Sequence, residues 1–339
     1  MNRSLLSACL LGFVLLALAG CSSDSRTKGT DTSNKTSHSD TIPTVGFVQA
    51  IEDATIDDAR QGFYDALKEA GYSEADGTVK ILYRNAQGDA AALNQIMDYM
   101  VGQKVDLIGA NTTLAMITAA NKTSTIPIFM MVAPSPEIAH LTKPDAGGNP
   151  IPPANLFGVY ETLAYIDTSV GLIRQVFPTA RRVGTIYNSS EPNSVNSLER
   201  LRTRCASLGL ELEAASVTSS NETQQVMQSL LGKGIDVFFA LPDNIIFSSF
   251  ETVQKQALEK KVPIVTSEAG LVKRGAFIAY GADFYAWGHQ AGVAAANYLK
   301  TRDPKKATLE IVAARKRTYN PETAQTLGLQ PPAGFDAIK

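Results

Sequence analysis

The sequence predicts an α/β protein that is built from two doubly wound parallel-sheet lobes. From residue 42 onward, short apolar runs alternate with stretches of helical periodicity, which is the pattern of strands and helices in turn. The same order of segments recurs about 130 to 140 residues further along the chain. A length of 339 residues, 44% of them hydrophobic, favours two folded domains and excludes a wholly disordered chain.

The first copy of the unit begins directly after residue 42. Apolar runs predict buried strands at residues 45–48, 80–83, 106–110 and 128–132. Helical patterns separate these runs. Phe63 and Leu67 fall on one helical face, and Thr112 or Thr113 is suited to cap the helix that follows the third strand. Strands that alternate with crossover helices form a parallel sheet with helices on both faces.

The second copy repeats this order. The run at Val183 matches the run at Val45, and residues 235–239 and 262–265 match residues 105–109 and 126–129. Such offsets predict a duplicated unit, although any two α/β domains share some of this order. We expect one lobe at residues 42–161 plus 284–306 and the other at residues 162–283 plus 307–335. A hinge and an interlobe cleft are expected where the chain crosses between the lobes.

The N-terminus has the features of a secretory signal. Arg3 precedes an apolar run at residues 5–18, which is too short for a typical membrane-spanning helix. Residues 18–21, Leu-Ala-Gly-Cys, resemble the lipobox of bacterial lipoproteins. This resemblance implies a signal peptide at residues 1–20 and a lipid on Cys21, whereas an ordinary cleaved signal is the alternative. We therefore expect a periplasmic or cell-surface protein that is lipid-anchored to a bacterial membrane.

A polar tether follows the predicted anchor. Residues 22–41 contain no aliphatic or aromatic side chain, so they cannot bury enough apolar surface to offset the entropy of ordering. We expect residues 21–41 to be a disordered, solvated tether between the lipid and the folded body.

Composition excludes several classes of function. The formal net charge of −2 argues against a nucleic-acid binder, which needs a basic face. Three cysteines and three widely spaced histidines predict neither a disulfide scaffold nor a metal site. Cys205 lies in an apolar helical stripe and is expected to be a buried thiol. Because catalytic and phosphate-binding motifs are missing from the sequence, we expect no enzymatic activity, no catalytic residue, no metal and no cofactor.

Candidate binding residues follow from position, because ligands bind beyond the carboxyl ends of parallel strands. Hydroxyl side chains at predicted helix starts suit a carboxylate, and nearby acids suit an ammonium group. A cleft that contains both the hydroxyl groups and the acids would suit a zwitterion such as an amino acid. One alternative is that the Ser, Thr and Asp residues only cap helices. Another is that the pair Asp243-Asn244 binds a sugar or nucleobase. The candidates are Glu52, Asp53, Thr112, Thr113, Asn188, Ser189, Ser190, Asp243, Asn244, Glu268 and Asp283.

Several segments resemble a known family. The segments are similar to those of ABC-transporter substrate-binding proteins related to tryptophan and tyrosine transport, and they comprise residues 85–89, 105–108, 187–194, 242–244, 272–276 and 280–290. The resemblance runs from about residue 44 to about residue 329. Pro242, the apolar residues 130–132 and the Asn111-Thr112-Thr113 segment depart from the family pattern at the expected cleft mouth.

The resemblance implies a type I periplasmic-binding-protein fold and a specific role. That role is capture of a small-molecule solute, an amino acid in our expectation, by hinged closure, followed by delivery to an ABC permease. We expect a monomer, with a ligand side chain that is apolar or aromatic. A sensory module for a signalling receptor and an extracellular enzyme that uses cleft carboxylates remain alternatives. Residues considered for an apolar end of the cleft are Met130, Met131, Tyr160, Tyr187, Phe247 and Trp287.

Overall fold

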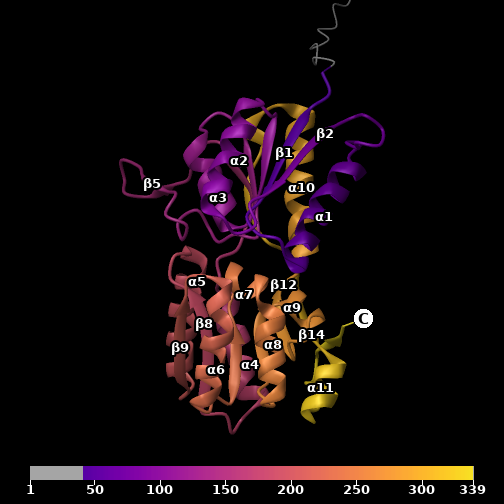
Figure 1. Cartoon of the computed structure of the whole chain (residues 1–339). Helices are drawn as coiled ribbons and strands as arrows, with labels where there is room; N and C mark the ends of the chain where they lie inside the picture. Colours follow the sequence, from indigo (N-terminus) through magenta and orange to yellow (C-terminus); the bar gives the residue numbers. More distant parts are fainter. Residues whose placement is uncertain (1–40, 339) are drawn as a thin grey trace, which may run out of the picture. The chain divides into compact units, whose positions relative to one another are not determined.

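The computed structural model describes residues 41–338. The predicted signal peptide, Cys21 and all but the last residue of the predicted tether lie outside the described residues. Within residues 41–338, no helix has both the length and the apolar character that are needed to cross a membrane. Two parallel-strand sheets, each flanked by helices, dominate this part of the chain (Figure 1).

The first sheet has six strands, all parallel, in the order β13-β7-β4-β3-β1-β2. Its central strands are buried on both faces, as a parallel sheet requires. The strands are β1 (Thr44–Gln49), β2 (Lys80–Asn85), β3 (Leu107–Asn111), β4 (Ile128–Met131), β7 (Leu156–Tyr160) and β13 (Leu309–Ile311). The helices of this lobe are α1 (Ala54–Glu69), α2 (Ala90–Gly102), α3 (Thr113–Lys122) and α10 (Phe284–Thr301), with η2 (Pro304–Lys306) and a small hairpin of β5 (Lys143–Pro144) and β6 (Pro150–Ile151).

The second sheet has seven strands in the order β15-β14-β12-β11-β10-β8-β9. Only the pairing of β12 with β14 is antiparallel. The strands are β8 (Arg182–Asn188), β9 (Glu211–Val217), β10 (Val237–Ala240), β11 (Ile264–Glu268), β12 (Ile278–Ala282), β14 (Arg315–Tyr319) and β15 (Asp336–Ala337). The helices are α4 (Tyr165–Val176), α5 (Pro192–Ser207), η1 (Ser220–Glu222), α6 (Thr223–Gly232), α7 (Asn244–Ser248), α8 (Phe250–Glu259), α9 (Ala269–Lys273) and α11 (Pro321–Leu327).

The chain crosses between the two sheets three times. It passes from β7 to α4, from β12 to α10, and from β13 to β14. The boundary that we expected at residue 307 is wrong for β13, because Leu309–Ile311 pairs with β7 of the first sheet. Although β13 is close to β14 in sequence, its backbone groups form hydrogen bonds with β7 at the open edge of the first sheet. The second lobe therefore resumes only at Arg315.

Two glycines hold α1 and α10 unusually close together (Figure 1). A Cβ on Gly288 would lie 1.8 Å from the carbonyl oxygen of Ala59, and one on Gly62 would lie 2.1 Å from that of Tyr285. Only residues without a side chain allow this approach. The contact fixes α10, whose first turn carries two aromatic residues of the candidate site.

Large apolar side chains fill the space between each sheet and its helices. Phe47, Phe63 and Phe129 are fully buried in the first lobe, and Phe238 and Phe277 are fully buried in the second. Cys205 is buried too, among apolar side chains of the second lobe. The prediction of a buried thiol is confirmed.

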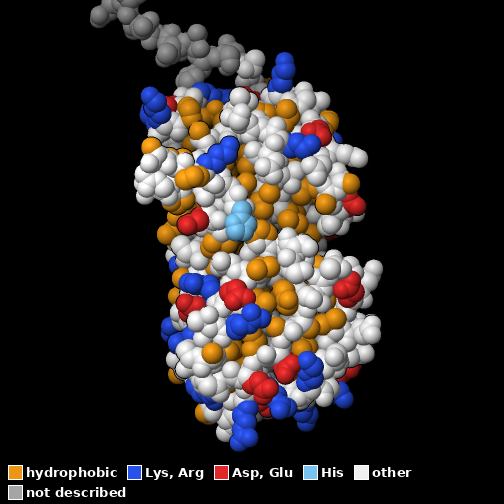
Figure 2. Space-filling view, turned by 90° about the vertical axis from the view of Figure 1, so that its left-hand side faces the viewer, with side chains coloured by type: hydrophobic (Ala, Val, Ile, Leu, Met, Phe, Trp, Pro, Cys, Tyr) orange, Lys and Arg blue, Asp and Glu red, His pale blue; other side chains and the backbone are white. Residues whose placement is uncertain are grey.

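On the face seen in Figure 2, basic and acidic side chains are interspersed rather than gathered by sign.

Candidate ligand-binding site

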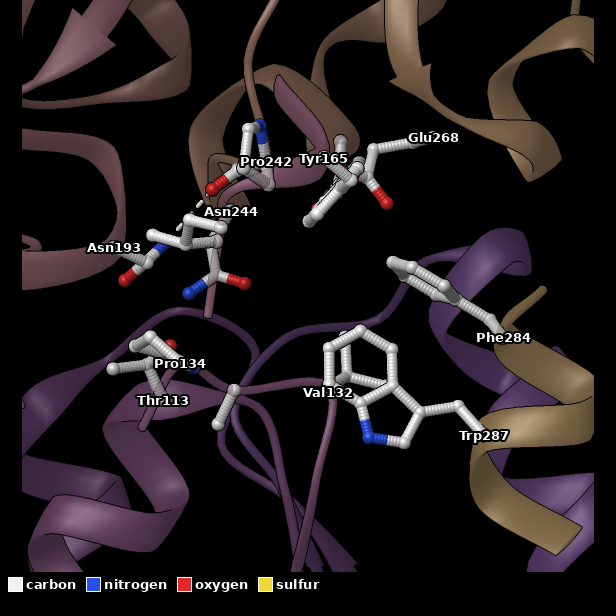
Figure 3. A pocket seen from close by; sticks show the side chains of 13 residues that line it. Thr113, Val132, Pro134, Tyr165, Asn193, Pro242, Asn244, Glu268, Phe284 and Trp287 are labelled. Atoms are coloured by element: carbon white, nitrogen blue, oxygen red, sulfur yellow. Dashed lines mark hydrogen bonds between the residues drawn. The ribbon is translucent and has the colours of Figure 1, made fainter. Parts of the chain in front are cut away.

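A narrow cavity of about 20 Å³ lies where strand ends of the first sheet face strand ends of the second. Both lobes contribute to its wall, together with the segments that cross between them (Figure 3). The lining is mostly apolar, as in typical small-molecule sites. The lining residues are Thr113, Val132, Ala133, Pro134, Leu163, Tyr165, Asn193, Pro242, Asn244, Phe247, Glu268, Phe284 and Trp287.

One side of the cavity is polar. Thr113 starts α3 and Asn193 lies in the first turn of α5, and neither helix has a side-chain hydrogen bond from its N-cap residue. The N-terminal N–H groups of a helix without such a cap attract an anion. Asn193 donates from Nδ2 to the carbonyl oxygen of Pro242 at 2.8 Å. Its Oδ1 is buried and has no partner among the described residues, so one acceptor remains for a ligand.

The opposite side of the cavity is aromatic. Phe284 packs edge-on against Trp287 with 5.8 Å between ring centroids, and against Phe247 with 5.9 Å. The indole N–H of Trp287 donates to the carbonyl oxygen of Val159 at 2.9 Å, which fixes the ring. Figure 3 shows Phe284 and Trp287 across the cavity from Asn193 and Thr113. Rigid aromatic walls of this kind suit a flat apolar ligand group.

Glu268 is the acid of this cavity, and it is fully buried at the end of β11. Its Oε1 accepts hydrogen bonds from the hydroxyl groups of Tyr165 at 2.7 Å and Ser267 at 2.9 Å. Its Oε2 is buried without a partner among the described residues. Burial raises the pKa of Glu268 to about 8, against the opposing effect of its two hydrogen bonds. The group is therefore mostly protonated at pH 7.

A second buried acid organises the polar side. Glu191 accepts from the side-chain amides of Asn188 at 3.0 Å, Asn193 at 3.2 Å and Asn244 at 3.0 Å. Burial, assisted by the charge of Asp243, raises the pKa of Glu191 to about 7. Glu191 is not among the binding residues predicted from the sequence. Its position directly after Asn188-Ser189-Ser190 was the available signal.

Three non-glycine residues at the cavity have positive φ angles. Thr112 has a φ of 84°, Val132 of 50° and Leu163 of 63°. These angles lie in the left-handed region, which a β-branched residue such as Val132 rarely adopts. The hydroxyl group of Thr112 is also buried without a hydrogen-bond partner among the described residues. Backbone strain of this kind is concentrated at ligand-binding sites.

Three of the predicted binding residues line the cavity, namely Thr113, Asn244 and Glu268. Thr112 directly precedes the lining residue Thr113. Asn188 does not line the cavity, and its side chain donates to Glu191. Ser189 and Ser190 are exposed and line a separate surface depression with Glu137 and His140. Glu52, also exposed, lines a wider depression of about 440 Å³ together with Asn188 and Asn244.

The remaining predicted acids are used as helix caps and do not reach the cavity. Asp243 caps α7 and also accepts from the Ser194 hydroxyl group. Asp283 caps α10 and forms an ion pair with Lys316. Asp53 caps α1 and forms an ion pair with Arg274. The alternative that these acids only cap helices therefore describes all three carboxylates.

Three residues that line the cavity, Tyr165, Asn193 and Phe284, are not among the binding residues predicted from the sequence. Phe284 directly follows the selected Asp283, and Asn193 follows the selected Ser190 by three positions. No local pattern marked Tyr165, which reaches the cavity because the chain crosses between lobes after β7. Of the aromatic and Met residues considered for an apolar end, only Phe247 and Trp287 line the cavity.

Within residues 41–338, no three His, Cys, Asp or Glu side chains are grouped as a metal ion requires.

A family model and a curated relative both match most of this chain. A family model described as ABC transporter substrate binding protein matches residues 44–334. A tyrosine-binding protein of Clostridioides difficile (strain R20291) is 33% identical over 327 residues, which cover 96% of this chain and 92% of that protein.

Solved structures agree with the family match. The ABC domain from Streptococcus pneumoniae in complex with L-Trp has a TM-score of 0.78 at 26% identity, with 88% of this chain and 100% of that chain covered. The ligand-free, open structure of a substrate binding protein with adhesive properties from Clostridium difficile has a TM-score of 0.63 at 28% identity, with 88% and 99% covered. The predicted type I periplasmic-binding-protein fold is confirmed. Because the family model spans nearly the whole described body, this protein is a member of the ABC transporter substrate binding protein family.

Proposed function

We propose that this protein captures an aromatic amino acid in the cavity between its lobes and delivers it to an ABC permease. The observation that carries the proposal is the division of one cavity into a polar side and a rigid aromatic side. Relatives support the ligand class, since one is a tyrosine-binding protein and another was solved with L-Trp.

The polar side would hold the amino-acid backbone of the ligand. Its carboxylate would meet the N-terminal N–H groups of α3 and α5, which no side chain caps. Its ammonium group would donate to the unpartnered Oδ1 of Asn193. The aromatic ring would then lie against Phe284 and Trp287, which contribute apolar contact area at little entropic cost.

Closure around the ligand would complete the site. Thr113 and Trp287 belong to the first lobe, whereas Asn193 and Glu268 belong to the second. Only the closed arrangement brings all four to one molecule, so ligand binding would favour it. The TM-score is higher with the L-Trp complex than with the ligand-free open structure, which supports a closed arrangement for the described body.

The cellular setting is part of the proposal. Cys21 would carry the lipid that anchors a monomeric protein outside the cytoplasmic membrane, with residues 21–41 as the tether. Membership of a substrate-binding transport family supports a role in binding rather than catalysis.

Isothermal titration calorimetry with the twenty amino acids tests this function on purified protein that starts at residue 22. We expect heat of binding from aromatic amino acids. Trp287→Ala should weaken that binding by about tenfold or more. Val293→Ala, an exposed position of the same helix, serves as the control and should leave the affinity unchanged. Failure of every amino acid to bind the folded protein would refute the proposal.

A further inference from the structure

Glu268 lines the candidate cavity and has one carboxyl oxygen without a hydrogen-bond partner among the described residues. The side chain is fully buried, Oε1 already accepts two hydrogen bonds, and Oε2 has no partner among residues 41–338. A buried polar atom without a partner is costly, so it is usually satisfied by a ligand or water in the functional state. The remaining question is which part of the ligand meets it.

The position of Glu268 in the sheet answers this question. Glu268 ends β11, whereas Asn193 follows β8, and β10 lies between these two strands. Two strand spacings separate the two positions by about 9–10 Å. Figure 3 accordingly shows Glu268 on the side of Phe284, away from Asn193 and Thr113.

An amino acid carries its carboxylate and ammonium groups on one carbon, so both must lie at the same side of the cavity. The uncapped starts of α3 and α5 and the free Oδ1 of Asn193 suit them on the polar side. The ligand side chain then extends past Phe284 and Trp287 and ends near Glu268.

Protonation decides which side-chain group fits Glu268. Because Tyr165 and Ser267 both donate to Oε1, the proton of a neutral Glu268 carboxyl group lies on Oε2. Burial raises the pKa of Glu268 to about 8, which is consistent with this neutral form at pH 7. An Oε2–H group needs an acceptor. A phenol oxygen accepts a hydrogen bond, whereas an indole N–H only donates and a phenyl ring offers neither.

We propose that Glu268 is the specificity-determining residue of the site, and that it selects a ligand with a ring hydroxyl group over one with a phenyl or indole ring. This inference rests on the proposed function and refines it. A ligand without the hydroxyl group would leave Oε2 buried and unpaired, and sites of this kind discriminate strongly against such analogues.

Calorimetry at pH 6.5 with L-tyrosine and L-phenylalanine tests the inference on wild type, Glu268→Gln and Glu268→Met. We expect wild type to prefer tyrosine by about 100-fold or more. Glu268→Met should reduce that preference to within about fivefold, because it removes the hydrogen bond to the ring hydroxyl. Glu268→Gln should keep most of the preference, since an amide of the same shape also donates at this position.

A ligand without the amine distinguishes the ring hydroxyl from the ammonium group as the partner of Glu268. We expect 3-(4-hydroxyphenyl)propionate to bind more weakly than tyrosine by the same factor in wild type and in Glu268→Gln. If the substitution abolishes the advantage of the amine instead, Glu268 binds the ammonium group and the inference is wrong.

The wild-type measurement alone keeps the inference falsifiable, even if Glu268→Met fails to fold. Equal affinities of wild type for tyrosine and phenylalanine overturn the role of Glu268 and leave the proposed function standing. Failure of wild type to bind any aromatic amino acid overturns the proposed function itself.

Discussion

Arg274 of the second lobe forms an ion pair with Asp53 of the first lobe, with 2.5 Å between Nη1 and Oδ2. The Asp53 side chain is only 1% exposed, so this contact between lobes is shielded from water. The same guanidinium group donates to both carboxylate oxygens of Glu251 and to the carbonyl oxygen of Phe247. Because Phe247 lines the cavity, Arg274 links the contact between the lobes to the aromatic side of the site.

Arg274→Ala is expected to weaken ligand binding by about tenfold or more, because closure would bury the Asp53 carboxylate without its partner. Calorimetry with the best-bound amino acid measures the loss, and small-angle scattering reports whether the unliganded protein opens. Arg202→Ala is the matched control, since Arg202 pairs with Glu199 on the exposed surface of α5. Unchanged affinity in Arg274→Ala would show that this ion pair does not stabilise closure.

Glu268 makes stability depend on pH. Burial raises its folded-state pKa to about 8 from an ordinary 4.5, so the folded protein keeps a proton that the unfolded chain releases. This contribution is fully present below about pH 4.5 and is lost as the pH rises through about 8. The groups that surround Glu268 are Tyr165, Ser267, Glu161 and Arg315, the last through a contact with the Tyr165 ring.

Glu268→Gln is neutral at every pH, whereas the surrounding groups are the same in both proteins. We expect the melting temperature of Glu268→Gln, measured relative to that of wild type at the same pH, to be higher at pH 9 than at pH 5. The increase should be on the order of a few degrees. Scanning calorimetry of the ligand-free proteins at both pH values measures this change. A difference between the two proteins that does not vary with pH would show that Glu268 titrates normally.

Gly288→Ala tests the close packing of α1 and α10. The added Cβ would lie 1.8 Å from a backbone oxygen of Ala59, so the helices must separate. We expect a loss of about 2 kcal/mol or more in the free energy of unfolding, measured by urea denaturation.

Gly232→Ala, at the end of α6, serves as the control for Gly288→Ala. Nothing lies within 4 Å of its added Cβ, so it should be neutral or stabilising by about 0.5 kcal/mol. Equal effects of the two substitutions would contradict the close contact between α1 and α10.

Cys205 is expected to be unreactive in the folded protein. It is 1% exposed, and burial raises the pKa of its thiol to about 12. In a chain that starts at residue 22, Cys205 is the only cysteine, so its labelling by Ellman's reagent can be followed without interference. We expect labelling only after denaturation. Rapid labelling of the native protein would contradict the buried position.

Sequence pattern determined which segments become strands and helices, because hydrophobic periodicity is a local property. The runs at residues 45–48 and 106–110 alternate with helical stripes, and this pattern alone predicted parallel sheets in two lobes. The position of β13 was different. Its pairing with β7 joins residues about 150 positions apart, and no local pattern records such a contact.

Strand ends also indicated where the site would be, since ligands bind beyond the carboxyl ends of parallel strands. Only the tertiary structure decided which side chains face the cavity. Asp243 and Asp283 turn back to cap their own helices, whereas Glu268 makes no cap hydrogen bond and lies against Tyr165, 103 positions earlier in the chain. A carboxylate that can satisfy a nearby backbone N–H group does so whatever the ligand, and the sequence does not record which neighbours folding will bring to the others.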